Sequence, residues 1–442
     1  MPEKTVLKNG IIVTMGKEGK IFEDGAVVVE GNRIIDVDKS HRIEKKHRGD
    51  VVIDARGKAV IPGLIDLHIH TALLRGVCDD IPLVPYVEKF WAPYTGALRP
   101  SETYAAALLS YTEAVKSGTT CVNDIYRHMI KCAEAAEKVG IRAVLASEAT
   151  EEKSFARETL RDNERLIIEK EGAADGRIRT SVGIDWFPTS SIEFLEKAVD
   201  LADKYGVGIH AHTNESIVEV EMCKKRHGKA PIELAYDLGL LRPKFVGAHC
   251  VWLSNREIKM LKETKASVSH NPTSNAKLGS GVAPIPELLK AGVNVGLGHD
   301  DTTCNNNADM FEAMKLASLL QRASRLDAGI MTAGQVLEMA TVNGARALGL
   351  GEEIGSIESG KKADLVLVNL KSVRLTPLIL RRYPNLLSHL VYSAHGDDVD
   401  TVIVDGKVVM KNRALINVDE AEVLERAQKA CDDLLDRVDL TF

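Results

Sequence analysis

The stretch Pro62-Gly63-Leu64-Ile65-Asp66-Leu67-His68-Ile69-His70 is an apolar run that ends in two histidines with one residue between them. Side chains at positions i and i+2 of a β-strand point to the same face, so His68 and His70 would project together from one strand end. Two imidazoles that converge on one point are typical ligands of a borderline cation such as Zn²⁺. The stretch therefore predicts a strand that carries part of a metal site.

Downstream of this stretch, short apolar strands alternate with helical segments, which is the pattern of βα units around a parallel sheet. One expected helix covers residues 101–117, with Ser101 as its N-cap and Gly118 as its stop signal. Eight βα units over about 240 residues match the size of a (β/α)8 barrel, an α/β fold of the TIM type. The eight expected strands cover residues 64–70, 121–125, 141–147, 178–185, 207–212, 245–249, 266–270 and 293–300.

The two ends of the chain differ from its middle, because they contain strand-like runs separated by turns. Gly31-Asn32 and Asp405-Gly406 lie between such runs and predict tight turns. A final helix is expected over residues 419–438. Residues 1–60 and 358–442 are therefore expected to form one small β-sandwich domain with a C-terminal helix, beside a barrel of residues 61–357.

The composition of the chain argues against some classes of binding partner. A net charge of −6 over 442 residues argues against non-specific binding to nucleic acid or to anionic membranes. No apolar run approaches the roughly 20 residues that a membrane-spanning helix needs. The seven cysteines contain no Cys-x-x-Cys pair, which suits free thiols in a reducing compartment. We expect a cytoplasmic protein with no nucleic-acid or membrane partner.

Metal-ligating side chains lie at the carboxyl ends of four expected strands, the edge where barrel enzymes build their active sites. Each alone has an ordinary interpretation, such as a buried core histidine or a helix N-cap, but their common position favours a metal centre. The strand expected over 178–185 contains no lysine that could bridge two ions, so one ion per chain is expected. The residues are His68, His70, His212, His249 and Asp300.

Glu215 follows His212 by three residues and adds a carboxylate beside the expected metal ligands. One carboxylate near a metal can take a proton from the attacking water and later deliver a proton to the substrate. The alternative is a first-turn acidic residue that complements a helix dipole. The neighbouring ligand favours the catalytic role.

Several segments together carry a resemblance to the amidohydrolase superfamily, in the branch that holds methylthioadenosine/S-adenosylhomocysteine deaminases, guanine deaminases and s-triazine hydrolases. The resemblance implies a mononuclear centre, with Zn²⁺ as the ion or Fe²⁺ as its alternative, and a homo-oligomer. The matching segments are residues 62–70, Leu73-Leu74-Arg75-Gly76, His212-Thr213-Asn214-Glu215, Gly247-Ala248-His249-Cys250, Ser269-His270-Asn271-Pro272, Ser274-Asn275 and residues 355–364.

The resemblance also implies roles for individual residues. His68, His70, His212 and Asp300 would bind the metal, and His249 would be a further ligand or would contact the water. Glu215 would shuttle the proton, which makes Glu215, His249 and Asp300 the expected catalytic residues.

The expected substrate-binding residues are Trp91, Thr95, His270, Asp301 and Cys304. Thr95 occupies the place of a glutamate that grips ribose hydroxyls in the nucleoside deaminases, and a hydroxyl lacks the paired acceptors of a carboxylate. Asp301 and Cys304 resemble the melamine-deaminase-like triazine enzymes, whereas His270 follows the nucleoside-deaminase pattern. These resemblances are mixed, and Thr95 favours a free heterocyclic base or a triazine over a nucleoside.

We therefore expect a metal-dependent aminohydrolase that releases ammonia from an amino-substituted nitrogen heterocycle, such as an s-triazine, a pyrimidine or a purine base. Three alternatives stay open. The chain could deaminate adenosine-type nucleosides and bind the ribose through other residues. It could displace chloride from a triazine, or it could be a non-catalytic barrel that binds a metal.

Overall fold

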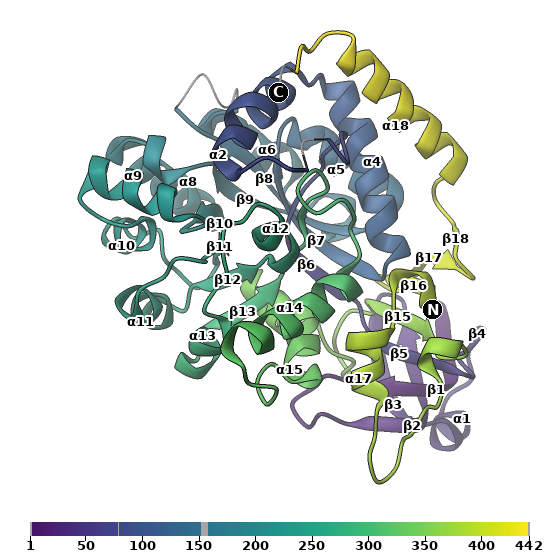
Figure 1. Cartoon of the computed structure of the whole chain (residues 1–442). Coiled ribbons are helices and arrows are strands. Elements are labelled where there is room, and N and C mark those ends of the chain that lie inside the picture. Colours follow the sequence, from purple (N-terminus) through teal and green to yellow (C-terminus); the bar gives the residue numbers. More distant parts are fainter. Residues whose placement is uncertain (1, 78, 152–157, 441–442) are drawn as a thin grey trace.

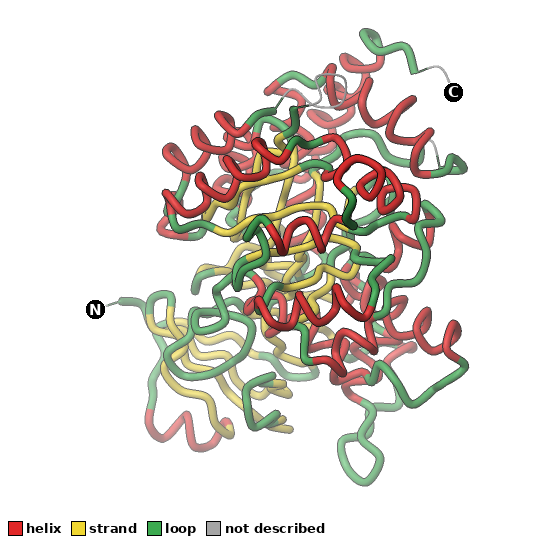
Figure 2. Tube along the Cα trace, turned by 90° about the vertical axis from the view of Figure 1, so that its left-hand side faces the viewer, coloured by secondary structure: helices red, strands yellow, loops and turns green. Residues whose placement is uncertain are grey.

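The computed structural model describes residues 2–77, 79–151 and 158–440. In these residues, parallel strands curl into a barrel that helices surround (Figures 1 and 2). The prediction of a TIM-type α/β barrel is therefore confirmed. The barrel strands are β6 (Leu64–His70), β7 (Thr119–Tyr126), β8 (Arg142–Ala149), β9 (Ile178–Ile184), β10 (Gly208–Thr213), β11 (Phe245–His249), β12 (Ser267–His270), β13 (Asn294–Leu297) and β14 (Asp300–Asp301).

The barrel closes through two short segments in place of the single strand expected over residues 293–300. β13 pairs in parallel with β12, and β14 pairs in parallel with β6. The chain breaks between them at Gly298, where a β-carbon would lie 2.6 Å from Asn271 Oδ1 and 2.9 Å from the backbone nitrogen of His68. The break re-aims the chain, so that Asp300 pairs with Ile69 and its side chain joins those of the first strand.

The strand β6 has the bounds that the sequence predicts, and all its residues are buried. Burial on both faces explains its continuous apolar character, since side chains on one face fill the barrel and those on the other pack against helices. The helix α4 begins at Pro100, one residue before the expected start, and Arg99 is its N-cap in place of Ser101. The Arg99 N–H donates to Glu102 Oε2 at 2.9 Å, which satisfies a donor that a Ser101 cap would have left free.

The helices cover the outside of the barrel and the loops above it (Figure 2). None of the helices in the described ranges is long and apolar enough to cross a membrane. Their bounds are α1 (Ser40–Lys46), α2 (Leu83–Tyr86), α3 (Ala92–Ala97), α4 (Pro100–Lys116), α5 (Met129–Val139), α6 (Leu160–Lys170), α7 (Ala173–Gly176), α8 (Ile192–Tyr205), α9 (Ile217–His227), α10 (Pro231–Asp237), α11 (Asn255–Thr264), α12 (Pro272–Lys277), α13 (Ile285–Ala291), α14 (Met310–Arg325), α15 (Ala333–Glu338), α16 (Gly344–Ala347), α17 (Leu386–Ser388) and α18 (Glu420–Leu435).

Strands from the two chain ends pair in a second sheet, which lies beside the barrel (Figure 1). Its order in the described residues is β18-β17-β16-β15-β5-β1-β2-β3, with β4 on β1, so the expected sandwich is one mixed sheet. The Gly31-Asn32 and Asp405-Gly406 turns join antiparallel pairs, as the sequence predicts. The strands are β1 (Lys4–Val13), β2 (Ile21–Glu30), β3 (Arg33–Lys39), β4 (Val51–Asp54), β5 (Lys58–Pro62), β15 (Leu365–Asn369), β16 (Val399–Val404), β17 (Lys407–Lys411) and β18 (Ala414–Leu415).

A buried ion-pair group joins the terminal sheet to the barrel. Arg142, at the start of β8, donates to Asp364 through Nε at 2.9 Å and through Nη2 at 3.0 Å. Its Nη2 also donates to Asp405 at 3.2 Å, and only 1% of the Arg142 side chain is exposed. The two carboxylates outweigh the effect of burial and raise the pKa of Arg142 above its ordinary value. Asp364 lies between the barrel and the sheet, so this group fixes the position of one against the other.

Candidate active site

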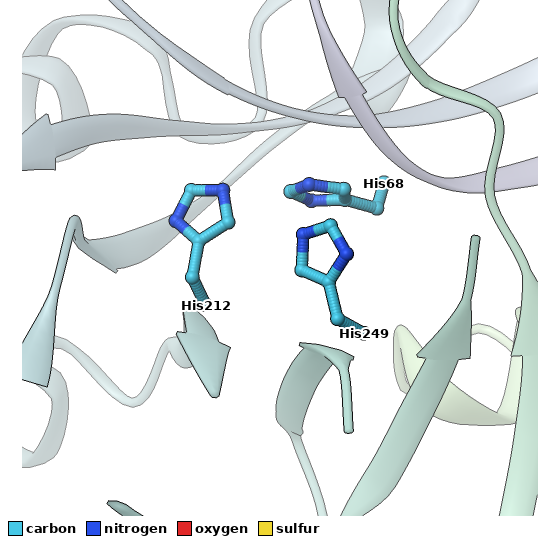
Figure 3. A group of neighbouring side chains, drawn as sticks. All are labelled: His68, His212 and His249. Carbon is cyan, nitrogen blue, oxygen red and sulfur yellow. The ribbon is translucent and has the colours of Figure 1, made fainter. Parts of the chain in front are cut away.

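The five predicted metal-ligating residues converge at the carboxyl end of the barrel. His68 and His70 come from β6, His212 from β10, His249 from β11 and Asp300 from β14. Figure 3 shows the rings of His68, His212 and His249 turned toward one common space. The ligand atoms of these three histidines lie within 4.8 Å of one another, and the same holds for His68, His70 and Asp300.

The distances between the donor atoms fit a small divalent cation. His70 Nε2 lies 3.1 Å from His212 Nε2, and Asp300 Oδ1 lies 3.3 Å from His68 Nε2 and 3.5 Å from His70 Nε2. Ligand atoms about 2.0–2.1 Å from a tetrahedral zinc ion are separated by about 3.3 Å. His68 Nε2 is buried and has no hydrogen-bond partner among the described residues. These donors therefore suit one divalent ion, and Zn²⁺ agrees with their nitrogen and oxygen chemistry.

The protonation of these side chains also suits metal binding. Burial lowers the pKa of His68 and of His70 well below the ordinary value, so both rings are neutral and keep a free lone pair. Burial alone would raise the pKa of Asp300, but His68, His249 and His70 outweigh it and hold that pKa well below the ordinary value. His68 and His70 thus offer neutral imidazoles and Asp300 offers a carboxylate, as a divalent cation requires.

A second layer of hydrogen bonds orients the rings. His68 Nδ1 lies 2.9 Å from His210 Nε2, and His70 Nδ1 contacts the Ile125 carbonyl oxygen. His212 Nδ1 donates to the Asp185 carbonyl oxygen at 2.9 Å. Contacts of this kind select the tautomer whose other nitrogen faces the metal. Ser274 Oγ similarly donates to Asp300 Oδ2 at 2.6 Å, and His249 Nδ1 lies 2.8 Å from Asn275 Oδ1.

Glu215 lies beside this group on the loop between β10 and α9. Its Oε1 is 3.9 Å from His249 Nδ1 and accepts a hydrogen bond from Ser280 Oγ at 3.1 Å. The Glu219 carboxylate accepts the backbone N–H groups of Asn214 at 3.2 Å and of Glu215 at 2.6 Å. These contacts hold the Glu215 carboxylate at the wall of the cavity described below.

Three residues of the site adopt left-handed backbone conformations that L side chains rarely take. Asn214 has a φ of 51°, His249 of 73° and Asp300 of 70°. Such conformations cost about 1–3 kcal/mol each and persist where the surrounding structure holds them. Each one lies at the end of a barrel strand, where His249 and Asp300 turn their side chains toward the shared space and Asn214 bonds instead to Trp252, Glu257 and Ile232.

A cavity of about 370 Å³ opens above the metal-ligating residues. Glu215, Trp91, Asp301 and Cys304 line it, together with His70, His212, His249 and Asp300. Apolar side chains from the loop helices form the opposite wall, among them Leu83, Val87 and Met222. The cavity therefore combines an apolar wall for a planar ring with polar groups at its floor, as small-molecule sites do.

Two of the predicted substrate-binding residues do not line this cavity. Thr95 is buried, donates to the Trp91 carbonyl oxygen at 2.8 Å and accepts from Arg127 Nη2 at 3.1 Å. His270 is buried, and burial lowers its pKa to about 3. Both of its ring nitrogens lack a hydrogen-bond partner among the described residues. Their roles in substrate binding stay predictions, and direct contact would require the substrate to reach below the cavity floor.

Two acidic residues that sequence reasoning did not single out line the same cavity. Glu148 lies near the end of β8, and Asp185 directly follows β9. Burial and the charge of Asp185 raise the pKa of Glu148 well above its ordinary value, and burial also raises the pKa of Asp185. The signal that could have found them is positional, because Asp185 ends the strand expected over 178–185 and Glu148 directly follows the strand expected over 141–147, at the edge where the predicted metal ligands lie.

The described fold and site agree with comparisons to known proteins. Residues 59–409 match the model of the amidohydrolase family. A 5′-deoxyadenosine deaminase from Methanosarcina acetivorans is 42% identical over 438 residues, which are 98% of either chain. A 5-methylthioadenosine/S-adenosylhomocysteine deaminase from Thermoanaerobacter pseudethanolicus is 39% identical over 98% of this chain and 99% of its own.

Solved structures extend the likeness to three dimensions. An adenosine deaminase from Xanthomonas campestris with bound zinc superimposes with a TM-score of 0.92 at 30% identity, over 99% of this chain and 100% of its own. An atrazine chlorohydrolase from Arthrobacter aurescens, complexed with zinc, superimposes with a TM-score of 0.88 over 96% of this chain and 99% of its own. At 22% identity, the latter shows the fold alone. The family match and the relatives that span the whole chain place this protein in the amidohydrolase family.

Proposed function

We propose that this protein is a metal-dependent hydrolytic deaminase of adenosine-type nucleosides, a class that includes 5′-deoxyadenosine and methylthioadenosine. The observation that carries the proposal is the 42% identity, over 98% of both chains, with a 5′-deoxyadenosine deaminase. A second relative of almost the same length acts on methylthioadenosine and S-adenosylhomocysteine, according to its name. These relatives favour the nucleoside alternative over the free ring or triazine that Thr95, Asp301 and Cys304 had favoured.

The geometry of the site supports the same reaction. Water replaces the exocyclic amino group of the purine, which gives ammonia and an inosine-type product. A divalent cation held by His68, His70, His212 and Asp300 supplies an acidified water as the nucleophile. Glu215, on the cavity wall, is placed to take one proton of that water and to deliver it to a ring nitrogen.

His249 has a position that suits stabilisation of the attacked ring. Its Nδ1 lies 3.9 Å from Glu215 Oε1, and its Nε2 lies 3.7 Å from Asp300 Oδ2. It therefore faces the space between the proton shuttle and the metal ligands, where negative charge develops during the attack. A preorganised hydrogen-bond donor in a water-poor cavity stabilises such charge strongly. The apolar wall excludes bulk water and receives the purine ring.

We further propose that Zn²⁺ is the resident ion, with one ion per chain, and that the protein acts in the cytoplasm as a homo-oligomer. The nitrogen and oxygen donor set and the zinc in the 30% identical structure support the choice of metal. Elemental analysis tests the ion and its stoichiometry, and light scattering tests the oligomeric state. An iron-only preparation with full activity would contradict the choice of zinc.

The test of the function is ammonia release by the zinc-loaded protein. The substrates are 5′-deoxyadenosine, methylthioadenosine, adenosine and S-adenosylhomocysteine, compared with adenine, guanine, cytosine and melamine. We expect release from the nucleosides, with kcat/KM above that for adenine by at least about 100-fold, because the sugar adds binding energy to the transition state. Release from free rings alone would contradict the proposal.

A further inference from the structure

We infer that Glu148 and Asp185 bind the sugar hydroxyls of the nucleoside substrate. This inference rests on the proposed function and names the part of the site that reads the ribose. Both side chains line the cavity that also contains Glu215 and the metal-ligating residues. Neither belongs to the five residues that converge as metal ligands at its floor.

The fold places the two carboxyl groups side by side. β8 and β9 are neighbouring parallel strands, with Glu148 paired with Gly183 and Ala149 with Ile184. The Asp185 N–H donates to the Ala149 carbonyl oxygen at 3.0 Å, so the residue after β9 continues this pairing. The backbone at both positions is fixed by the sheet, and a ligand would meet a rigid pair of carboxyl groups.

The Glu148 carboxyl group is buried and incompletely satisfied. Its side chain is 1% exposed, and Oε2 has no hydrogen-bond partner among the described residues. The nearest cationic atom to that oxygen is Arg127 Nη2 at 3.4 Å, which lies behind the cavity wall. A buried acceptor that faces a cavity without a partner costs free energy unless a ligand supplies the donor. The hydroxyl groups of a sugar are such donors.

The position of the pair relative to the reacting groups fits a nucleoside. A carboxyl oxygen of Glu148 lies within 4.8 Å of the ring nitrogens of His70 and His212, on the side of the metal group that faces β8. Asp301 lies on β14, which is separated from β8 by β6 and β7 in the sheet. A purine held at Glu215 and the metal ligands therefore has Asp301 on one side, and its sugar can extend toward Glu148 and Asp185 on the other.

In the nucleoside deaminases that this chain resembles, a ribose-gripping glutamate stands where this chain has Thr95, and Glu148 and Asp185 can supply the missing carboxyl groups. The Thr95 hydroxyl is occupied by the Trp91 carbonyl oxygen and by Arg127 Nη2, and Thr95 does not line the cavity. The same Arg127 nitrogen approaches Glu148 Oε2. Arg127 thus contacts both Thr95, where the nucleoside deaminases carry a glutamate, and the carboxyl group of Glu148, which lines the cavity. Carboxyl groups are still present for the ribose, but they come from the ends of β8 and β9 and not from α3.

The test compares ribonucleosides with analogues that lack one hydroxyl, in matched variants. The substrates are adenosine, 2′-deoxyadenosine and 3′-deoxyadenosine, and the variants are Glu148→Gln and Asp185→Asn. The controls are Glu196→Gln and Asp200→Asn, which change exposed residues of α8. In the unchanged protein we expect kcat/KM to fall by roughly 10- to 100-fold when a contacted hydroxyl is removed, because a buried acceptor is then left unpaired.

The variants separate this inference from a general loss of activity. In Glu148→Gln or Asp185→Asn, the preference for adenosine over the deoxy analogue should shrink to within about threefold, while the deoxy analogue is turned over nearly as well as before. The controls should keep the full preference. An unchanged preference in both cavity variants would overturn the inference. So would an unchanged protein that does not distinguish adenosine from either analogue.

A binding measurement gives a readout that does not depend on turnover. Calorimetric titration of the zinc-loaded protein should show that inosine binds at least about 10-fold more tightly than 2′-deoxyinosine or 3′-deoxyinosine. Equal binding of all three products would overturn the inference even if the variants fold poorly. The absence of ammonia release from every nucleoside would instead contradict the proposed function. Nucleoside turnover that ignores the hydroxyls would contradict the role of Glu148 and Asp185 alone.

Discussion

Ser280 Oγ donates a hydrogen bond of 3.1 Å to Glu215 Oε1, although the two residues are 65 positions apart in the chain. The carbonyl oxygen of Ser280 accepts from Trp252 Nε1 at 2.7 Å, so its own loop is held from a second side. The proposed proton shuttle is therefore oriented by the hydroxyl group of a residue on a separate loop. Ser280 is a positioning residue, because it acts through Glu215.

Replacing Ser280 by alanine tests this relationship. We expect kcat to fall by about 5- to 20-fold, as the loss of one hydrogen bond to a carboxylate implies, with the zinc content unchanged. Ser280→Thr keeps a hydroxyl group and should retain most of the activity. Ser324→Ala, at an exposed position of α14, is the matched control. Equal losses in the alanine and threonine variants would contradict hydrogen bonding as the cause.

Replacing Glu215 by glutamine tests the proton shuttle itself. The amide keeps the size of the side chain but cannot accept and return a proton, so kcat should fall by about 10²- to 10⁴-fold. Metal content, measured by elemental analysis, should stay at one ion per chain. Glu221→Gln, at an exposed position of α9, should leave kcat unchanged. A Glu215→Gln enzyme with normal turnover would rule out this role.

Removal of the metal should abolish activity and lower stability. Dialysis against a chelator should stop ammonia release, and one equivalent of Zn²⁺ should restore it. Free Zn²⁺ at about 100 times its dissociation constant should stabilise the folded state by about 2.7 kcal/mol, which raises the melting temperature. Asp300→Asn removes one charged donor and should weaken this shift. Scanning calorimetry measures it, and identical melting curves with and without zinc would contradict a site of this kind.

Arg142 offers a prediction about stability that is independent of the active site. Arg142→Met leaves Asp364 buried without its cation and Asp405 with only Lys362 Nζ at 3.9 Å, and breaking a buried pair in this way costs about 3–5 kcal/mol. The free energy of unfolding in urea should fall by that amount. Arg165→Met removes an exposed ion pair of α6 with Glu169 and should cost less than about 1 kcal/mol. Similar losses in the two variants would show that the buried group contributes little.

The charge of the cavity predicts which 5′ substituents are accepted. Apart from the histidines, every charged side chain that lines the described wall is acidic, including Glu88, Glu148, Asp185 and Glu215. A phosphate would meet these carboxylates without a lining cation in the described residues, and like charges repel strongly in a poorly solvated site. Adenosine 5′-monophosphate should therefore have a kcat/KM at least about 10-fold below that of adenosine. A phosphate that increased kcat/KM would contradict this prediction.

Local patterns predicted the parts of the molecule that depend on local chemistry. The sequence predicts the bounds of β6 because its apolar run begins directly after Gly63 and ends with His68 and His70. The break between β13 and β14 was not predictable in this way, because Gly298 is required by a close approach to Asn271 and His68. Distant contacts of that kind leave no periodic signal in the sequence.

The residues of the candidate site divide in the same way, into those that a local pattern predicts and those that only the folded structure reveals. The convergence of His68, His70, His212, His249 and Asp300 could be predicted, because side chains at the carboxyl ends of barrel strands meet at one edge. Glu148 and Asp185 carry only a positional signal, and an acidic residue at a strand end resembles a solvent-exposed loop residue until the cavity is known. Thr95 was assigned to the substrate from its place in a family pattern, whereas the packing of Arg127 against its hydroxyl decides what it contacts.

The two-residue strand β14 has a consequence for how this protein folds. It is the segment that pairs with β6 to close the barrel, and only Asp300 and Asp301 take part in that pairing. Closing a loop of this length costs considerable chain entropy, and two backbone pairs repay little of it. His68 and His70 lie on β6 and Asp300 lies on the paired strand β14. An ion bound by all three would therefore link the first and last strands of the barrel. Removal of that ion would then weaken the closure of the barrel as well as stop the proposed reaction.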